Sequence, residues 1–281
     1  MKIYDIYSEK KQPVSLEIFP PKGELSTENA RSILSGLCPL APDFISVTYH
    51  SGASLTPEKT IAICSMIKNE FLIESMAHIT CISSTRTAVK QTLGALKQNG
   101  IENVLALRGD IPADAVCGEY NYASELISEL SGSGLSIGAA CYPEIHPECD
   151  SAEENLRYMK LKEDAGAGFF ISQLFFDNKL FFDFIDKVRR AGIKAPVSAG
   201  IMPILSRTQI SRMIFTCAAS LPAAIIRILN KYENSPDDLS KAGFEYACGQ
   251  MRGILDSTDC GVHIYTMNRP DIASGILGGR K

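Results

Sequence analysis

Short apolar runs recur along the chain, and each of them ends in polar or glycine-rich residues. The first run, VSLEIF at residues 14–19, alternates apolar and polar side chains and stops at a Pro-Pro pair. Alternation with a period of two and a proline stop are typical of a short β-strand. Eight such runs predict strands, at residues 14–19, 44–49, 76–81, 103–110, 136–144, 169–177, 196–203 and 262–269.

Helical patterns lie between several of these runs. Residues 87–100 are amphipathic and end on a glycine. Residues 151–168 open with a Ser-x-x-Glu capping box and close with glycines, and residues 179–192 place basic side chains in the last turn. Because capping boxes, C-terminal glycines and basic last turns mark helix ends, we predict a helix in each segment.

Strands that alternate with helices predict parallel strand–helix–strand units. Eight such units close into a (β/α)8 barrel, an α/β fold. The interval before the last run is much longer than the others and has room for extra helices between the seventh and eighth strands. No linker, repeat or low-complexity segment divides the chain, so we predict a single domain over residues 1–281.

Composition and charge narrow the classes of function. The chain has 281 residues, a formal net charge of −4 and no long basic run, which argues against a nucleic-acid partner. Residues 1–13 lack the apolar core of a signal peptide, and polar side chains interrupt the most apolar region, residues 168–185, so we predict no membrane span. Nine cysteines without a CxxC pair predict reduced thiols and a cytoplasmic location.

Polar residues gather at the C-terminal ends of the predicted strands, where chemistry collects in such a barrel. A carboxylate, Glu17, lies inside the first apolar run, and the histidines His50, His78 and His146 lie at or just past strand ends. A lone strand carboxylate can simply face water, but this accumulation indicates an active site. Three histidines at one mouth could hold a metal, yet no obvious zinc spacing and no GxxxxGK[ST] or HExxH motif occurs, and we predict no metal site. The glycine-rich stretch GSGLSIG at residues 132–138 leads into a predicted strand instead of following one, so we interpret it as a turn and not as a nucleophile elbow.

Nine motifs follow one another along the chain: EIFPPKG, DFISVTYHSG, MAHITC, NGIENVLALRGDIP, YASELI, AACYPEIHPE, QLFFD, GIMPI and YTMNR. Together they resemble the catalytic barrel of bacterial-type 5,10-methylenetetrahydrofolate reductase, from about residue 14 to residue 270. The resemblance implies noncovalent FAD at the C-terminal face and reduction of 5,10-methylenetetrahydrofolate to 5-methyltetrahydrofolate, which supplies methyl groups for methionine synthesis. It also implies a ping-pong reaction, in which NADH or NADPH reduces the flavin and leaves before the folate binds.

The resemblance also assigns the reacting groups. Opening the five-membered ring of the folate requires a general acid, and Glu17 matches that acid, because its apolar strand is expected to raise the carboxyl pKa. Asp110 matches an aspartate that would stabilise a cationic iminium, with a helix N-cap as the alternative. For Gln173 and Arg269 the alternatives are a core-strand amide and a surface salt bridge. The implied substrate contacts are Asp110, Gln173, Gln209, Tyr265 and Arg269.

The implied flavin contacts combine basic, aromatic and small residues. Arg108 and Lys162 could offset pyrophosphate charge, whereas the tyrosines could stack on the flavin or pack as ordinary core rings. The histidines could equally cap loops or be satisfied core residues. The full set is Thr48, Tyr49, His78, Arg108, Gly109, Asp110, Tyr122, Ala123, Tyr142, His146, Asn155, Tyr158 and Lys162.

Three positions depart from the family pattern. Asn155 replaces an aspartate that binds the FAD ribose, and Tyr158 replaces an asparagine. Met213 replaces an aromatic residue that packs near the substrate and the nicotinamide. These departures put the adenosine end of the flavin site and the nicotinamide site in question.

Other functions stay open beside this one. The same flavoenzyme could receive electrons from a partner protein, which Met213 favours, or the chain could be a folate- or flavin-binding subunit with little activity. An unrelated barrel enzyme such as an aldolase would need a Schiff-base lysine at a strand end, and none of the eight runs contains lysine. We expect a homo-oligomer, and a single FAD-binding catalytic barrel over 1–281 without a C-terminal regulatory domain.

Overall fold

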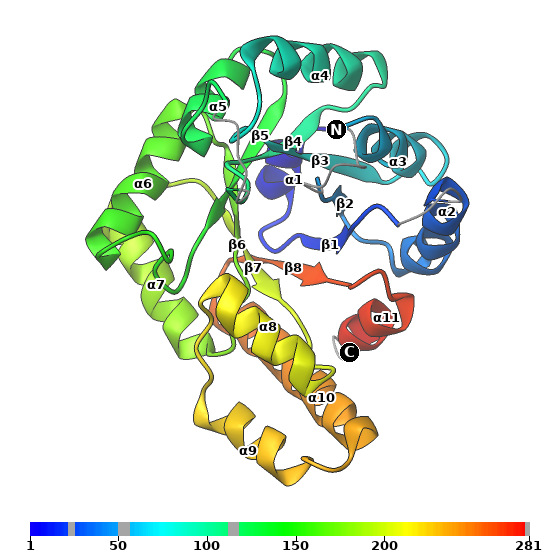
Figure 1. Ribbon diagram of the computed structural model, residues 1–281, viewed down its shortest axis with the longest axis vertical. Helices are drawn as coiled ribbons and strands as arrows, with labels where there is room; N and C mark the ends of the chain where they lie inside the picture. The colour runs from blue at the N-terminus through cyan, green and yellow to red at the C-terminus, as the bar shows by residue number, and fades with distance from the viewer. Residues whose placement is uncertain (22–25, 50–56, 112–117, 279–281) are drawn as a thin grey trace.

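The computed structural model describes residues 1–21, 26–49, 57–111 and 118–278. Its eight strands are all parallel and close into a barrel in chain order, the last strand pairing with the first (Figure 1). Every predicted run contains a strand, and each strand ends before its run does. The strands are β1 (Val14–Ile18), β2 (Phe44–Val47), β3 (Glu74–Thr80), β4 (Asn103–Leu107), β5 (Ser136–Cys141), β6 (Phe169–Ser172), β7 (Val197–Ile201) and β8 (Gly261–Tyr265).

Helices follow the strands and cover the outside of the barrel (Figure 1). They are α1 (Ile3–Glu9), α2 (Ser26–Leu37), the 3-10 helix η1 (Cys38–Leu40), α3 (Pro57–Asn69), α4 (Arg86–Gln98), α5 (Ala123–Leu130), α6 (Ala152–Ala165), α7 (Asn178–Arg190), α8 (Arg207–Cys217), α9 (Ala223–Lys231), α10 (Pro236–Ser257) and α11 (Pro270–Gly278). The three predicted helices are α4, α6 and α7. The extra helices expected before the last strand are α8, α9 and α10. Of these, α10 packs against β7 and β8, and α9 packs against α10. Among the described helices, none is long and apolar enough to cross a membrane.

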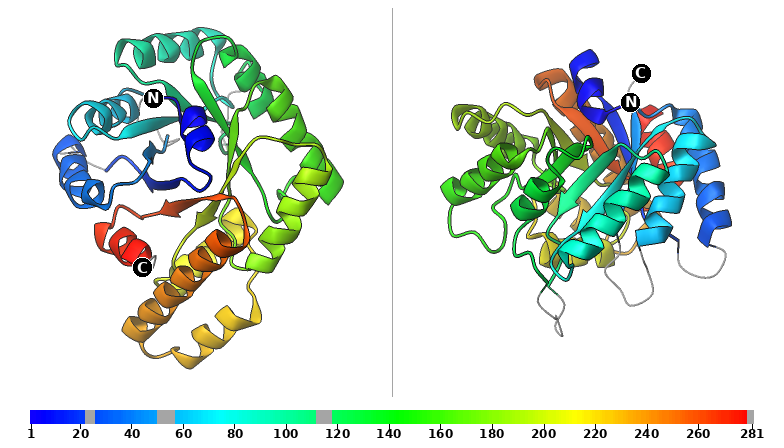
Figure 2. Two further views of the ribbon diagram at one scale, coloured as in Figure 1. Left: turned by 180° about the vertical axis from the view of Figure 1, so that it is seen from behind. Right: turned by 90° about the horizontal axis from the view of Figure 1, so that it is seen from above.

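The N-terminal end of the barrel interior is filled by apolar side chains. Phe44, Met76 and Phe169 point inward from their strands and pack against Ile3 and Ile6 of α1. The short helix α1 lies across the barrel opening in both views of Figure 2, and its pattern was too short to predict from the sequence. Because this end is closed, the polar strand ends can meet a ligand only at the opposite mouth.

Local signals set the ends of α6, which carries several predicted cofactor residues. Glu154 N donates to Ser151 Oγ at 3.1 Å, as the capping box predicts. The helix ends at Gly166, whose φ of 122° lies in the region that favours glycine. The sequence therefore fixes where α6 begins and ends beside β5.

Candidate active site

Glu17 points into the C-terminal mouth of the barrel and is surrounded by polar side chains. The strand register places it beside Ser46 of β2 and Tyr265 of β8. Its Oε2 lies 3.2 Å from His263 Nε2 and 3.5 Å from both His78 Nε2 and Ser46 Oγ. The Glu17 side chain is 17% exposed, so it faces this polar group and does not simply point into bulk water.

A fully buried histidine, His263 on β8, connects Glu17 to a second residue of β1. Its Nδ1 lies 2.7 Å from Ser15 Oγ, which also lies 3.2 Å from the carbonyl oxygen of Val262. Ser15 and Glu17 are two positions apart on one strand, so both side chains point inward. The sequence prediction missed His263. The signal that could have identified it is the alternation in VHIYT, because His263 and Tyr265 are two positions apart and their side chains point to the same face of the strand.

The surroundings of Glu17 lower its carboxyl pKa, and the predicted increase is therefore wrong. Burial by itself would raise the pKa, but the hydrogen bond with His263 and the electrostatic effect of His78 outweigh it. The apolar neighbours Leu16 and Ile18 belong to the core between strands and helices, which leaves the inward face polar. Burial lowers the pKa of His78 to about 4, so this imidazole is neutral at pH 7.

Two predicted substrate residues, Gln173 and Tyr265, are fixed by backbone groups at the ends of β6 and β8. Tyr265 Oη donates to the carbonyl oxygen of Ser172 at 2.9 Å, and burial raises the pKa of the phenol well above its ordinary value. Gly200 makes this contact possible, because a Cβ there would lie 2.4 Å from the Ser172 carbonyl oxygen. Leu174 N donates to Gln173 Oε1 at 2.9 Å. Both side chains therefore have defined orientations in the protein alone.

A second part of the mouth, at the ends of β4 and β5, is charged. Arg108 forms a two-pronged ion pair with Glu148, in which Nη2 lies 2.6 Å from Oε1 and Nη1 contacts Oε2. Gly109 has a φ of 86°, and a Cβ there would lie 3.0 Å from Thr80, so the turn requires glycine. Asp110 follows this turn and is exposed. The tight turn thus presents a guanidinium and a carboxylate at neighbouring positions.

Lys162 of α6 brings a further cation to this charged region. Its Nζ donates to the Ala140 carbonyl oxygen at 3.0 Å and lies 5.5 Å from the centre of the Tyr142 ring. Burial lowers the pKa of the ammonium group, and Nζ makes no ion pair with a carboxylate of the described residues. The ring of His146 packs edge-on against Tyr142, and its Nδ1 accepts from Glu148 N at 3.1 Å. A partly buried cation that makes no ion pair within the described residues suits an anionic ligand.

Four of the predicted flavin contacts come together where α5 begins beside α6. The rings of Tyr122 and Tyr158 are stacked, with centres 6.4 Å apart, and Ala123 begins α5 directly after Tyr122. The Tyr158 hydroxyl donates to a carboxylate one turn earlier on α6. Asn155 is buried, and its Nδ2 donates to the Tyr142 carbonyl oxygen at 3.0 Å. In this conformation Asn155 therefore supports the β5 loop with its amide nitrogen.

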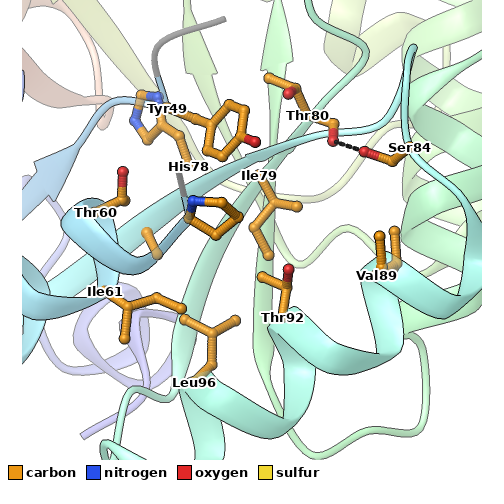
Figure 3. A pocket seen from close by; sticks show the side chains of 13 residues that line it. Tyr49, Thr60, Ile61, His78, Ile79, Thr80, Ser84, Val89, Thr92 and Leu96 are labelled. Carbon is orange, nitrogen blue, oxygen red and sulfur yellow. Dashed lines mark hydrogen bonds between the residues drawn. The ribbon is translucent and has the colours of Figure 1, made fainter. Parts of the chain in front are cut away.

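Thr48, Tyr49 and His78 lie at the ends of β2 and β3. Thr48 Oγ1 and His78 Nε2 are buried, and neither makes a hydrogen bond within the described part of the chain. Tyr49 and His78 also line a small pocket of about 70 Å³ between α3 and α4 (Figure 3). Most walls of this pocket are helix residues, so it lies beside the mouth into which Glu17 points. Unpaired buried polar atoms are uncommon in folded proteins and mark a place where a ligand could bond.

In two predicted substrate residues, Gln209 and Arg269, the polar side-chain atoms bond to groups a few residues away in the chain. Gln209 Oε1 accepts from Leu205 N at 2.7 Å, and Gln209 Nε2 donates to the Pro203 carbonyl oxygen at 3.1 Å. Arg269 Nη2 lies 2.6 Å from Asp271 Oδ2, with both side chains more than half exposed. The surface salt bridge that was the alternative for Arg269 is thus present, and the substrate roles of Gln209 and Arg269 stay predictions.

Neither a metal site nor a disulfide is present in the part of the chain that the structure describes. Within it, no three His, Cys, Asp or Glu side chains are grouped so that they could hold a metal ion, and the eight described cysteines are unpaired. His50 lies outside the described residues. Met213 is partly buried and, like Tyr265, packs against the apolar cluster that includes Leu174 and Met202.

Comparison with known proteins gives consistent matches along the whole chain. The family model described as methylenetetrahydrofolate reductase matches residues 2–279. The chain is 32% identical to methylenetetrahydrofolate reductase (NADH) 1 of Arabidopsis thaliana, over 98% of this chain and 49% of that protein. It is 31% identical to 5,10-methylenetetrahydrofolate reductase of Pectobacterium carotovorum and 30% identical to that of Escherichia coli, over 94% of this chain and 88% of each relative.

The chain spans about half the length of the plant relatives that it matches. Among solved structures, an uncharacterized protein from Clostridium thermocellum that binds two copies of 5-methyl-5,6,7,8-tetrahydrofolic acid matches with a TM-score of 0.68 and 14% identity. The match covers 99% of this chain and 98% of that one, and it supports the barrel fold.

Proposed function

The chain belongs to the methylenetetrahydrofolate reductase family, and we propose that it reduces 5,10-methylenetetrahydrofolate to 5-methyltetrahydrofolate with FAD as its resident cofactor. The observation that carries the proposal is the position of Glu17, a carboxyl group in the C-terminal mouth bonded to a buried histidine. The relatives include proteins named for NADH and for NADPH, so we propose a nicotinamide as the electron source.

Folate reduction needs a proton before it needs a hydride. The methylene carbon lies in a five-membered ring and accepts a hydride poorly until a weakly basic ring nitrogen is protonated and the ring opens. We assign delivery of this proton to Glu17, because its carboxyl group is within the mouth and remains partly exposed. Asp110 at the rim would stabilise the cation that ring opening creates.

The lowered pKa of Glu17 means that the resting group is a carboxylate, which must take up a proton before it can act as an acid. Ser15 and His263 can hold both protonation states. In one arrangement Ser15 Oγ donates to His263 Nδ1, and Nε2–H donates to the Glu17 carboxylate. In the other, Ser15 Oγ donates to the Val262 carbonyl oxygen, Nδ1–H donates to Ser15, and protonated Glu17 donates to Nε2. Rotation of one hydroxyl and a change of tautomer therefore accompany protonation, and Glu17 keeps its hydrogen bond.

The chain's own residues fit a flavin dinucleotide at this mouth. Thr48 Oγ1 makes no hydrogen bond within the described residues and could bond one of its polar groups, and Lys162 is a partly buried cation that an anion would stabilise. Arg108 lies close enough to Lys162 to disfavour its positive charge, so a pyrophosphate could contact both. When bound, FAD would carry a hydride from the nicotinamide to the folate carbon.

Two measurements on the purified chain test this proposal. Heat or acid release should yield FAD, identified by chromatography, and the protein should form 5-methyltetrahydrofolate when supplied with a nicotinamide and the methylene substrate. A protein that binds folate and FAD but forms no methyl product with NADH or NADPH would contradict the proposed reaction. A colourless protein that binds no FAD would contradict the proposed cofactor.

A further inference from the structure

Glu148 holds the guanidinium that the proposed function assigns to the cofactor pyrophosphate. Both terminal nitrogens of Arg108 contact the two carboxylate oxygens of Glu148. Arginine also binds phosphate through two parallel N–H···O hydrogen bonds of this kind. A phosphate and Glu148 would therefore compete for the same two N–H donors of Arg108. The sequence analysis assigned no role to Glu148, although it belongs to the AACYPEIHPE motif.

The charges around Arg108 favour an exchange of Glu148 for a ligand with two negative charges. Arg108 and Lys162 each carry a positive charge, and Arg108 lies close enough to help lower the Lys162 pKa. Glu148 pairs with Arg108, whereas Lys162 makes no ion pair with a described carboxylate. A pyrophosphate brings two charges and could neutralise both cations, which one carboxylate cannot do.

The geometry of the loop makes Glu148 easy to displace. The Glu148 side chain is 55% exposed and that of Arg108 only 21%, so the carboxylate lies on the solvent side of the pair. Glu148 N and Cys149 N both donate to His146, at its Nδ1 and its carbonyl oxygen. The backbone can therefore keep its place while the Glu148 side chain turns into water. Exposed ion pairs contribute little to stability, so the protein loses little when this one opens.

We propose that Glu148 is a displaceable counter-ion that sets the affinity of the cofactor site. Without a ligand it neutralises and orients Arg108, and the diphosphate of the dinucleotide displaces it on binding. This inference rests on the proposed function, because it takes FAD as the ligand. It assigns Glu148 as a residue that weakens cofactor binding by competition, without contact to the reacting atoms.

The test compares ligand binding by the full chain prepared free of flavin. In Glu148→Gln the dissociation constant for FAD, measured by flavin fluorescence or calorimetry, should fall about three- to tenfold, while that for riboflavin, which lacks phosphate, should not change. Arg108→Gln should weaken FAD binding, and adding Glu148→Gln to it should then give no gain. Glu70→Gln is the matched control: Glu70 also forms a two-pronged pair, with Nε and Nη2 of Arg31, with both side chains 47% exposed, and FAD affinity should not change.

The outcomes separate this inference from the function on which it rests. Unchanged or weaker FAD binding by Glu148→Gln, in a chain whose unaltered form binds FAD, would overturn the inference and leave the proposed function standing. If the unaltered chain binds no FAD, the proposed cofactor fails, and calorimetry with inorganic pyrophosphate decides the inference. Tighter pyrophosphate binding by Glu148→Gln would support the competition, and equal binding would overturn it.

Discussion

The mouth of the barrel has two sides that are built in different ways. Where β1 meets β8, Glu17, His263 and Ser15 bond to one another inside the barrel, and His263 is fully buried. Where β4 meets β5, Arg108 is paired with Glu148, which comes from an irregular loop and is more than half exposed. The first side is fixed by the strands themselves, and the second is held by a contact that can open.

This difference matches what each side has to do under the proposed function. Proton transfer needs a donor at a defined position and distance, and strand residues with hydrogen-bonded neighbours supply it. A cofactor site must admit a charged ligand, so its cations need partners that can leave. The following predictions test whether the two sides are as distinct as this account requires.

The largest expected effect is on the strand-built side. Glu17→Gln should slow folate reduction by roughly 10²- to 10⁴-fold, because a general acid is lost, while reduction of the flavin by a nicotinamide should continue. Anaerobic stopped-flow spectroscopy follows the two half-reactions separately. Glu74→Gln is a matched control, since Glu74 is a strand carboxylate with 19% exposure beside Lys68 at the other end of the barrel, and it should change neither half-reaction. Equal losses in both half-reactions of Glu17→Gln would show a structural role.

On the exposed side, Asp110→Asn should be milder. We expect folate reduction to slow by roughly 10- to 10³-fold through lost electrostatic stabilisation, and the flavin midpoint potential to rise because a nearby anion is removed. Potentiometric titration of the variant measures the second effect without turnover. A potential equal to that of the unaltered protein would place Asp110 away from the flavin.

His78 should make the strand-built side sensitive to acid. Its folded pKa of about 4 lies below the ordinary value of 6.5, so the unfolded chain takes up the proton first. The stabilisation is therefore present above pH 6.5 and is lost as the pH falls towards 4, by roughly 3 kcal/mol of unfolding free energy for this single group. Urea unfolding at a series of pH values should show a shallower acid loss in His78→Gln. The same slope in both proteins would mean that His78 is not buried as a neutral ring.

The smallest expected effect is at the far end of the hydrogen-bonded chain. Ser15→Ala removes a partner of His263 Nδ1 and should slow folate reduction by about fivefold, the value of one hydrogen bond, without slowing flavin reduction. The pH dependence of the folate half-reaction should also shift, because Ser15 takes part in both protonation arrangements. A folded Ser15→Ala protein with an unchanged pH profile would exclude Ser15 from the proton chain.

The pattern of apolar residues along the chain was sufficient to predict the barrel fold. It was not sufficient to predict the pKa values of the groups at the barrel mouth. Short apolar runs predicted every strand, because the parallel strands of a barrel are buried on both faces and their residues are mostly apolar. The pKa of Glu17 depends instead on His263 and His78, which reach it through the strand register. The neighbours Leu16 and Ile18, on which the wrong prediction relied, face the helices.

The loop contacts were beyond the reach of sequence reasoning for a similar reason. Arg108 and Glu148 are far apart in the sequence, and nothing in either segment marks the other as its partner. Gln209 also looked free as a sequence residue, yet its amide bonds the backbone of the loop that precedes α8. Residue types at strand ends indicated the location of the site, and contacts between strands and loops determine the state of each group.

Under the proposed function, one mouth of the barrel takes electrons from a nicotinamide and passes them to a folate. Anaerobic titration of the purified holoprotein tests this reaction, with the visible absorbance of the flavin reporting its redox state. NADH or NADPH should bleach the flavin, 5,10-methylenetetrahydrofolate should then restore its colour, and 5-methyltetrahydrofolate alone should bleach it in the reverse direction. A flavin that neither nicotinamide nor 5-methyltetrahydrofolate can bleach would contradict the account.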